Sequence, residues 1–293
     1  MRRAALLALS ALLFAACEKD AVEETGEMEG DPVMLTFAPT LFGAAPDCST
    51  SGSLGAGEVD VTLADARFFV HGVQAMSAEG QWVDMMLHDD GQWQFSGVAL
   101  LDFEDGTGSC ADGGTADLNA MVHGELPPGE YSGLRFNVGV PFELNHLDSA
   151  TADAPMNTPG MFWSWQGGYK HLRVDFVVNE KVPVRWNTHL GSTGCVSDAP
   201  TQAPAEACDQ PNVATITLDG FVPGTDTIAL DLSTLAGDVD LSTNTVDTPP
   251  GCMSAPSEPD DCAPVFQALG MSFESGECEA DCAAQTLFSV SAG

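Results

Sequence analysis

His171-Leu-Arg-Val-Asp-Phe-Val-Val178 alternates apolar with polar side chains over most of its length. Such alternation indicates a β-strand with one face turned toward a core. Similar runs recur along the chain, with Asp-Gly and Pro-Gly turn signals between them, at residues 33–37, 59–63, 67–73, 82–87, 98–103, 134–138, 214–218, 227–232 and 286–290. A helix is expected only near 263–269. The pattern predicts an all-β chain, an antiparallel β-sandwich or barrel-like domain, and no βαβ units.

The loops expected between these strands are long, at 40–58, 142–168, 190–213 and 242–285. Loops of this length on a β scaffold either carry function or need cross-links. An even number of cysteines in an exported chain predicts disulfides, and the alternative of thiolate metal ligation lacks the Cys-x-x-Cys spacing of a structural zinc site. Spacing leaves the pairing open; the disulfide candidates are Cys48, Cys110, Cys195, Cys208, Cys252, Cys262, Cys278 and Cys282.

The N-terminus has the form of an export signal. A basic head, Met1-Arg2-Arg3, precedes an apolar run that ends where Cys17 and acidic residues begin. The run is too short for a transmembrane helix but has the length of a signal-peptide core. The expected divisions are a signal peptide at 1–16, a lipidated Cys17 with a flexible tether over 17–32, and a single β domain over 33–293. The protein would then lie in the periplasm or at the cell surface, attached to a bacterial membrane through lipid only. An ordinary secretory signal with an incidental cysteine is the alternative.

The composition is strongly acidic, with 43 Asp and Glu against 9 Lys and Arg and a formal net charge of −34 at pH 7. A chain of this charge repels phosphate backbones, so nucleic acid is not an expected partner. The sequence holds no P-loop, no G-x-G-x-x-G opening a helix, no H-E-x-x-H and no G-x-S-x-G elbow. Carboxylates are so abundant that a glycosidase pair could be chosen almost anywhere. These sequence features therefore select no catalytic class.

Histidine and tryptophan residues gather in the segment 145–195. His146 and His189 lie toward the two ends of this segment, and Trp163 and Trp165 lie between them. Neutral imidazole suits copper, which heads the affinity order of divalent metals for such ligands. His71, in the expected strand 67–73, is a third candidate ligand. The alternative is that these are hydrogen-bonded structural histidines and that the tryptophans serve packing.

Several longer motifs resemble one known family. The two most specific are Met161-Phe-Trp-Ser-Trp-Gln-Gly-Gly-Tyr-Lys170 and His189-Leu-Gly-Ser-Thr-Gly-Cys195. The supporting runs are Arg67-Phe-Phe-Val70, Leu100-Leu-Asp-Phe-Glu104, Gly139-Val-Pro-Phe142, Asn145-His146, Pro211-Asn212 and Gly251-Cys-Met-Ser254. On these motifs the chain resembles the MbnP-like proteins, also called metallo-mystery pair four-Cys motif proteins, which are related to the copper proteins MopE and CorA. The resemblance spans residues 33–290, which favours a single domain.

This resemblance implies an exported protein that binds copper. In the family, a di-haem, cytochrome c peroxidase-like partner protein of the MbnH type oxidises a tryptophan to kynurenine, which helps to form the metal site beside histidine. It therefore implies His146, His189 and His71 as copper ligands, and Trp163 or Trp165 as the modified tryptophan. The chain would be the substrate of an enzyme and no enzyme itself. The alternative is a disulfide-stapled β-sandwich module for surface interactions without a functional metal site. A carbohydrate-active β-sandwich that uses carboxylates is a third hypothesis.

Overall fold

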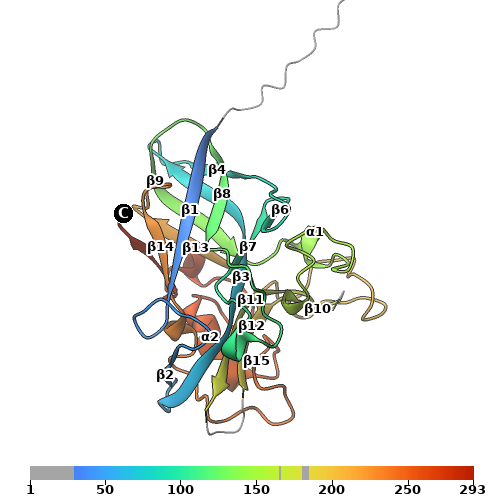
Figure 1. Ribbon diagram of the computed structural model, residues 1–293. Coiled ribbons are helices and arrows are strands. Elements are labelled where there is room, and N and C mark those ends of the chain that lie inside the picture. Colours follow the sequence, from blue (N-terminus) through green and yellow to red (C-terminus); the bar gives the residue numbers. More distant parts are fainter. Residues whose placement is uncertain (1–29, 165, 180–184) are drawn as a thin grey trace, which may run out of the picture.

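The computed structural model describes residues 30–164, 166–179 and 185–293. The expected signal peptide, Cys17, most of the tether and Trp165 lie outside these residues. Within them the chain forms a 5-stranded and an 11-stranded sheet, arranged as shown in Figure 1. The structure is mostly β, so the predicted all-β sandwich is confirmed.

The smaller sheet has β1 (Asp31–Thr40) at its centre, in the strand order β16-β14-β1-β8-β5. β1 runs antiparallel to β8 (Met121–Leu126) and parallel to β14 (Thr227–Asp231). β16 (Phe288–Ser291) and β5 (Met86–Leu87) form the two edges. The β1–β14 pair departs from the antiparallel pattern because no short hairpin joins these two strands.

The larger sheet is organised on β3 (Val59–Ser77), a strand of 19 residues. Its main path runs β13-β9-β3-β11-β12-β15, and shorter strands pair beside this path. The other strands are β13 (Ala214–Asp219), β9 (Tyr131–Val138), β11 (Gly168–Val178), β12 (Arg185–Gly191), β15 (Gly251–Cys252), β2 (Ser51–Leu54), β4 (Trp82–Asp84), β6 (Gln94–Phe95), β7 (Val98–Asp102) and β10 (Phe162–Ser164). A second parallel pair joins β12 to β15.

Helical segments are short. The longer helix, α2 (Pro259–Ala268), covers most of the expected 263–269 and begins earlier, with a proline in its first turn where the missing N–H costs nothing. The remaining segments are α1 (Phe142–Asn145) and the 3₁₀ turns η1 (Gly108–Cys110), η2 (Pro159–Met161), η3 (Leu232–Leu235) and η4 (Ala280–Cys282). In the described part of the chain, no helix has the length and apolar character needed to cross a bilayer.

Two strand predictions needed revision. The runs 59–63 and 67–73 belong to the single strand β3, because the backbone stays paired with β11 through Ala64-Asp65-Ala66 between them. The run 82–87 is split at the buried Met85, so that β4 pairs in the larger sheet and β5 in the smaller one. Met85 therefore marks the point where the chain passes from one sheet to the other.

The main core lies between the two sheets. Phe37 of β1 meets Phe68 of β3 edge to face, with ring centroids 5.9 Å apart. Phe288 of β16 meets Phe136 of β9 in the same way at 5.4 Å. Because each pair joins one sheet to the other, these aromatic contacts hold the layers together, and such pairs contribute about 0.5–1.5 kcal/mol each beyond area burial.

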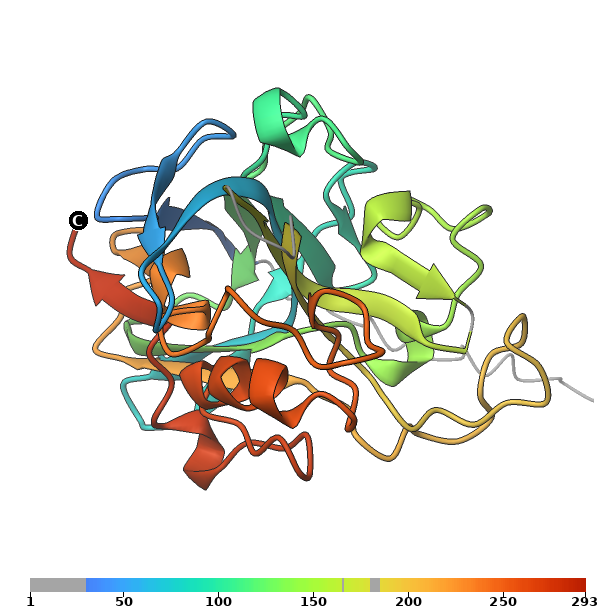
Figure 2. The same ribbon diagram turned by 90° about the horizontal axis from the view of Figure 1, so that it is seen from below.

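The opposite face of the larger sheet is also covered. A second, smaller apolar cluster lies there, with Phe69, Leu100 and Tyr169 from the strands and Met156 and Met161 from the long segment after β9. Figures 1 and 2 show α1 and β10 on the side of the molecule away from β14 and the C-terminal strand. We call this covered side of the larger sheet the outer face. It carries the candidate site.

The four disulfides predicted from the even cysteine count are present. Three join nearby residues within the long loops, and the fourth ties the loop before β2 to η1. The pairs are Cys48–Cys110, Cys195–Cys208, Cys252–Cys262 and Cys278–Cys282.

Candidate metal centre

His171 lies on β11 with its side chain on the outer face, where the alternation places Tyr169, Arg173 and Asp175 beside it. It is fully buried. Burial lowers the pKa of His171 to about 4, so the imidazole is neutral at pH 7. Its Nδ1 lies 3.0 Å from the carbonyl oxygen of Asn212, which can only accept a hydrogen bond. The proton therefore sits on Nδ1, and the Nε2 lone pair is buried with no partner among the described residues.

His71 lies on the neighbouring strand β3 and presents the same pattern. Its Nδ1 donates to the carbonyl oxygen of Gly139 at 2.9 Å, which leaves the lone pair on Nε2. Burial lowers the pKa of His71, although the bond to Gly139 partly opposes that effect. Gly139 has φ +146°, and a Cβ there would lie 3.0 Å from Nδ1 of His171. The glycine thus lets the backbone pass closely between the two histidines.

His146 is placed by its neighbour Asn145, which is buried at the end of α1. The Asn145 side chain accepts from the backbone N–H of Tyr169 at 2.9 Å and donates to Ser192 Oγ at 3.2 Å. These bonds fasten α1 to β11 and to the end of β12. After burial and the Asn212 bond, the charges of His71 and His146 further affect the pKa of His171, and both lower it.

His189 lies on β12 and pairs across the sheet with Arg173, two residues from His171 along β11. Its Nε2 lies 2.9 Å from a carboxylate oxygen of Asp175. Burial lowers the pKa of His189, while the Asp175 charge opposes that shift. The neutral ring then donates its Nε2 proton to Asp175, and Nδ1 is a buried lone pair without a described partner. The carboxylate–histidine pair orients that lone pair as in metal sites with an outer-shell carboxylate.

A chain of buried charges runs from His189 across the outer face. Asp175 also accepts from Arg173 at 2.8 Å, and Arg173 reaches Asp65 at 3.0 Å. Asp65 pairs with Arg67, whose other nitrogen lies 3.5 Å from Glu104. Burial raises the pKa of Asp175, but His189 and Arg173 outweigh it and hold the carboxyl below its usual value. The alternating charges therefore keep Asp175 ionised as the acceptor for His189.

Trp163, on β10, packs against the same region. Its ring centroid lies 6.3 Å from that of His189, at an interplanar angle of 49°. The ring also covers Gly191 so closely that a Cβ there would lie 2.4 Å from Trp163 Cζ3. Trp163 is half-buried and directly beside the His189–Asp175 pair. The other tryptophan candidate, Trp165, is outside the described residues.

Two groups of side chains that could hold a metal ion in the described residues contain cysteine sulfur atoms. His146 Nε2 is 3.7 Å from Cys208 Sγ, and Cys195 completes that group. A second group consists of Glu104 with Cys48 and Cys110. In both groups the two cysteines are joined in a disulfide, so neither supplies the thiolate that binds metals strongly. The imidazoles are the stronger donors on this face.

The structure thus places the three histidines predicted from the sequence, His71, His146 and His189, on the outer face. His71 and His171 both lie against Gly139, and His189 lies on the strand next to His171. In the described part of the chain, no group of three potential ligands with donor atoms within 4.8 Å of one another contains two of these histidines. His171 and His189 are buried neutral imidazoles, each with one ring nitrogen that has no hydrogen-bond partner among the described residues, and such donors can bind a borderline metal ion such as copper. The residues present fit that ion.

Sequence reasoning did not select His171, although it opens the strand 171–178. A polar residue in an alternating strand suggests a solvent-facing position, and only the covering segment after β9 makes this face buried. Asp175 was missed for the same reason. The run Pro211-Asn212 was noted only for the family resemblance, and its contact with His171 was not predicted. Asn212, with φ +50° and its carbonyl on His171, lies in a loop that alternation does not describe.

The comparisons with known proteins agree on one family. A family model described as MbnP matches residues 30–254. Among solved structures, the one described as "MbnP from Methylosinus trichosporium" is similar with 32% sequence identity and a TM-score of 0.77. The match covers 90% of this chain and 99% of that chain. No curated protein sequence gives a significant match.

Proposed function

The chain belongs to the MbnP family, and from that membership and the histidine arrangement we propose that it binds copper outside the cytoplasm. The observation that carries the proposal is His171, whose buried Nε2 lone pair has no partner in the part of the chain that the structure describes. An unpaired buried polar atom costs about 1–3 kcal/mol. A metal ion would offset that cost. We expect His71, which lies on the other side of Gly139, and His146 to be further ligands.

His189 and Trp163 form the adjoining part of the proposed centre. We expect one tryptophan, Trp163 or Trp165, to be oxidised to kynurenine by a di-haem, peroxidase-like partner. Support comes from the position of Trp163, which is half-buried against β12 and beside His189. The amine and ketone of kynurenine would add donors next to a lone pair that Asp175 already orients.

We also propose a cellular location and a role for the protein. Lipidation at Cys17 would hold the protein at a bacterial membrane, in the periplasm or at the cell surface, with copper as its cargo. The disulfides support an oxidising compartment, because such bonds persist outside the cytoplasm. The role is that of a binding protein and a substrate of its partner, with no reaction of its own.

The test is copper titration of four forms of the purified protein: the wild type, His171→Gln, His189→Gln and His123→Gln. Each form is made with and without co-expression of a di-haem partner, and mass spectrometry reads the tryptophan peptides for loss of one carbon and gain of one oxygen. His123 is exposed on β8 of the other sheet and serves as the matched control.

We expect His171→Gln to weaken copper binding at least about tenfold, since loss of a group that only hydrogen-bonds a metal ligand already costs about 10- to 100-fold. The control should bind like the wild type. Equal copper affinity of the wild type and His171→Gln would remove His171 from the centre. An unmodified tryptophan together with no tight copper binding under both conditions would overturn the copper function itself.

A further inference from the structure

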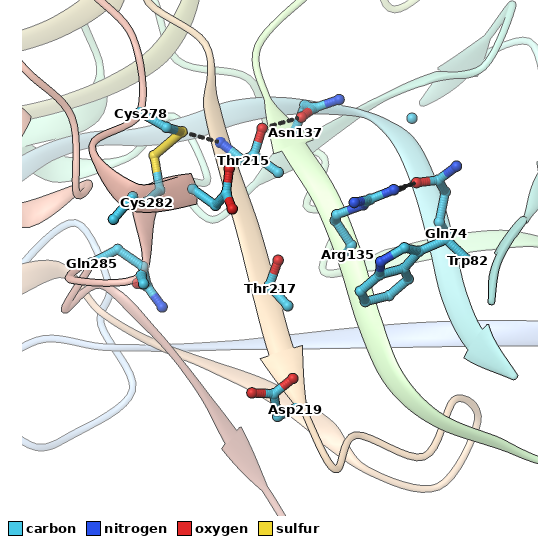
Figure 3. Close-up of a pocket in the computed structure, with 14 residues that line it drawn as sticks. Gln74, Trp82, Arg135, Asn137, Thr215, Thr217, Asp219, Cys278, Cys282 and Gln285 are labelled. Carbon is cyan, nitrogen blue, oxygen red and sulfur yellow. Dashed lines mark hydrogen bonds between the residues drawn. A yellow bond between two sulfur atoms is a disulfide. The ribbon is translucent and has the colours of Figure 1, made fainter. Parts of the chain in front are cut away.

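A separate groove of about 690 Å³ lies where β3, β9 and β13 meet the C-terminal segment around η4. Figure 3 shows its floor and walls. The floor consists of Arg135 and Asn137 on β9 and of Thr215 and Thr217 on β13, which pair directly across the sheet. One wall is Trp82, and the other contains the Cys278–Cys282 disulfide. None of the four histidines on the outer face lines it.

Arg135 is held in a fixed position in this groove. Its guanidinium carbon lies 4.5 Å from the centroid of the Trp82 ring, and Nε donates to Gln74 at 3.0 Å. Nη2 donates to the same Gln74 oxygen. Within the described ranges, no group accepts from Nη1 and no carboxylate pairs with the guanidinium. The positive charge of Arg135 therefore faces the groove without a direct carboxylate contact; Asp219 and Asp281 line the groove elsewhere, and Asp84 accepts from the amide nitrogen of the same Gln74.

Other hydrogen-bonding groups lie beside this charge. Thr215 donates to the Asn137 side-chain oxygen at 2.8 Å, which turns the Asn137 amide nitrogen toward the other side. That nitrogen and the exposed Thr217 hydroxyl have no hydrogen-bond partner in the described residues. Asp219 follows Thr217 along the same side of β13 in Figure 3. The floor thus offers donors around Arg135 and a carboxylate acceptor at one end.

We propose that this groove binds a carboxylate-bearing saccharide. The carboxylate would accept hydrogen bonds from the free Nη1 edge of the Arg135 guanidinium, because charge-assisted hydrogen bonds are stronger than those between neutral groups. The hydroxyl groups would meet Asn137 on β9 and Thr217 and Asp219 on β13, which together offer hydrogen-bond donors and acceptors. The site is distinct from the histidine region and needs no metal.

The lining favours a saccharide over a peptide. Peptide-binding grooves provide apolar pockets for side chains or a free strand edge. Here the floor is a sheet face of polar side chains, and Trp82 is its one aromatic residue. A ligand covered with hydroxyl groups can satisfy such a surface, whereas apolar side chains would leave its donors unpaired.

The experiment is calorimetric titration of the purified full-length protein with trigalacturonic acid. Maltotriose is the neutral saccharide control, and an acidic peptide of similar charge is the control for the carboxylate alone. The variants are Arg135→Gln and Thr217→Val, with Arg185→Gln as the matched variant. Arg185 lies outside the groove, near the exposed Asp112, and its loss changes the net charge equally. Circular dichroism checks that each variant is folded.

We expect saturable binding of trigalacturonic acid that Arg135→Gln weakens by about tenfold or more and Arg185→Gln leaves unchanged. Thr217→Val, at an exposed position, should weaken binding severalfold with little risk to folding. Absence of binding by the wild type, equal binding by Arg135→Gln, or equal binding of maltotriose would each overturn the proposal. Tighter binding of the peptide than of the saccharide would overturn the saccharide assignment.

Discussion

At the scale of single residues, His171 combines complete burial with a neutral ring. Burial holds its pKa at about 4, whereas the ordinary histidine pKa is about 6.5. The unfolded chain therefore binds a proton that the folded chain does not between these two values. Stability contributed by the neutral ring is fully present above about pH 6.5 and is lost as the pH falls toward about 4.

Replacing His171 with Gln should therefore reduce the acid sensitivity of folding. The shift corresponds to a loss on the order of 3 kcal/mol in the free energy of unfolding between about pH 6.5 and pH 4. Urea denaturation of metal-free protein across that range measures it. Because the pKa values of His71 and His189 are also lowered, some pH dependence should remain. His123→Gln, exposed on β8, should retain the wild-type slope; identical slopes for wild type and His171→Gln would contradict the prediction.

The pair of Asp175 with His189 and Arg173 gives a second prediction at this scale. All three side chains are largely buried, so removing the carboxylate leaves a guanidinium and an imidazole without their partner. Asp175→Asn should cost about 3–5 kcal/mol of unfolding free energy. Chemical denaturation measures it, with Asp112→Asn as control. Asp112 is 94% exposed and 4.0 Å from Arg185, so its change should be small. Comparable losses of unfolding free energy in Asp175→Asn and Asp112→Asn would show that burial of the Asp175 network does not contribute to stability.

At the scale of elements, β10 and β12 meet at one glycine. Gly191→Ala would place a Cβ 2.4 Å from Trp163 Cζ3 and 2.9 Å from the carbonyl oxygen of Tyr169. The Tyr169 carbonyl belongs to the backbone of β11 and cannot yield easily, so the indole of Trp163 would have to shift. We expect a loss of about 1–3 kcal/mol and a change in near-ultraviolet circular dichroism from the displaced indole. Gly57→Ala is the control, since its Cβ would make an ordinary contact at 3.5 Å. A spectrum that stays unchanged in Gly191→Ala would place Trp163 elsewhere.

The strands show how far alternation predicts this fold. β11, β13 and β14 match their predicted runs to within a few residues, because each has one face in the main core. β8 and β12 were not predicted, since His123-Gly124 and Asn187-Thr188 interrupt the apolar pattern. Alternating polarity shows which side chains lie on the same face of a strand. It does not show whether a segment later in the chain covers the polar face.

The candidate site was predicted in part for the same reason. His146 and His189 were selected from motifs, and His71 as a third candidate in the expected strand 67–73. Their positions relative to His171 depend on pairings between β3, β11 and β12, and on the bonds that Asn145 makes to β11 and to Ser192 after β12. Such long-range contacts leave no local signal in the chain.

At the scale of the whole molecule, the disulfides differ in how much chain they close. Cys48–Cys110 spans 62 residues and Cys278–Cys282 spans 4. In the chain-entropy description, loops of these lengths stabilise by about 4 and about 2 kcal/mol. Replacing both cysteines of the first pair by Ala should therefore lower the melting temperature more than the same change in the second pair. Calorimetry of the two double variants tests this, and the reverse order would contradict it.

The parallel pairing of β1 with β14 also governs the order of assembly. Thr36 pairs with Thr227, and β14 in turn pairs with β16 near the C-terminus. In a chain made from its N-terminus, β1 therefore keeps one edge unpaired until β14 has emerged. Contacts between residues so far apart in sequence form slowly, and open strand edges pair readily with other chains. The smaller sheet thus leaves the incomplete chain dependent on whatever shields the open edge of β1 until β14 is available.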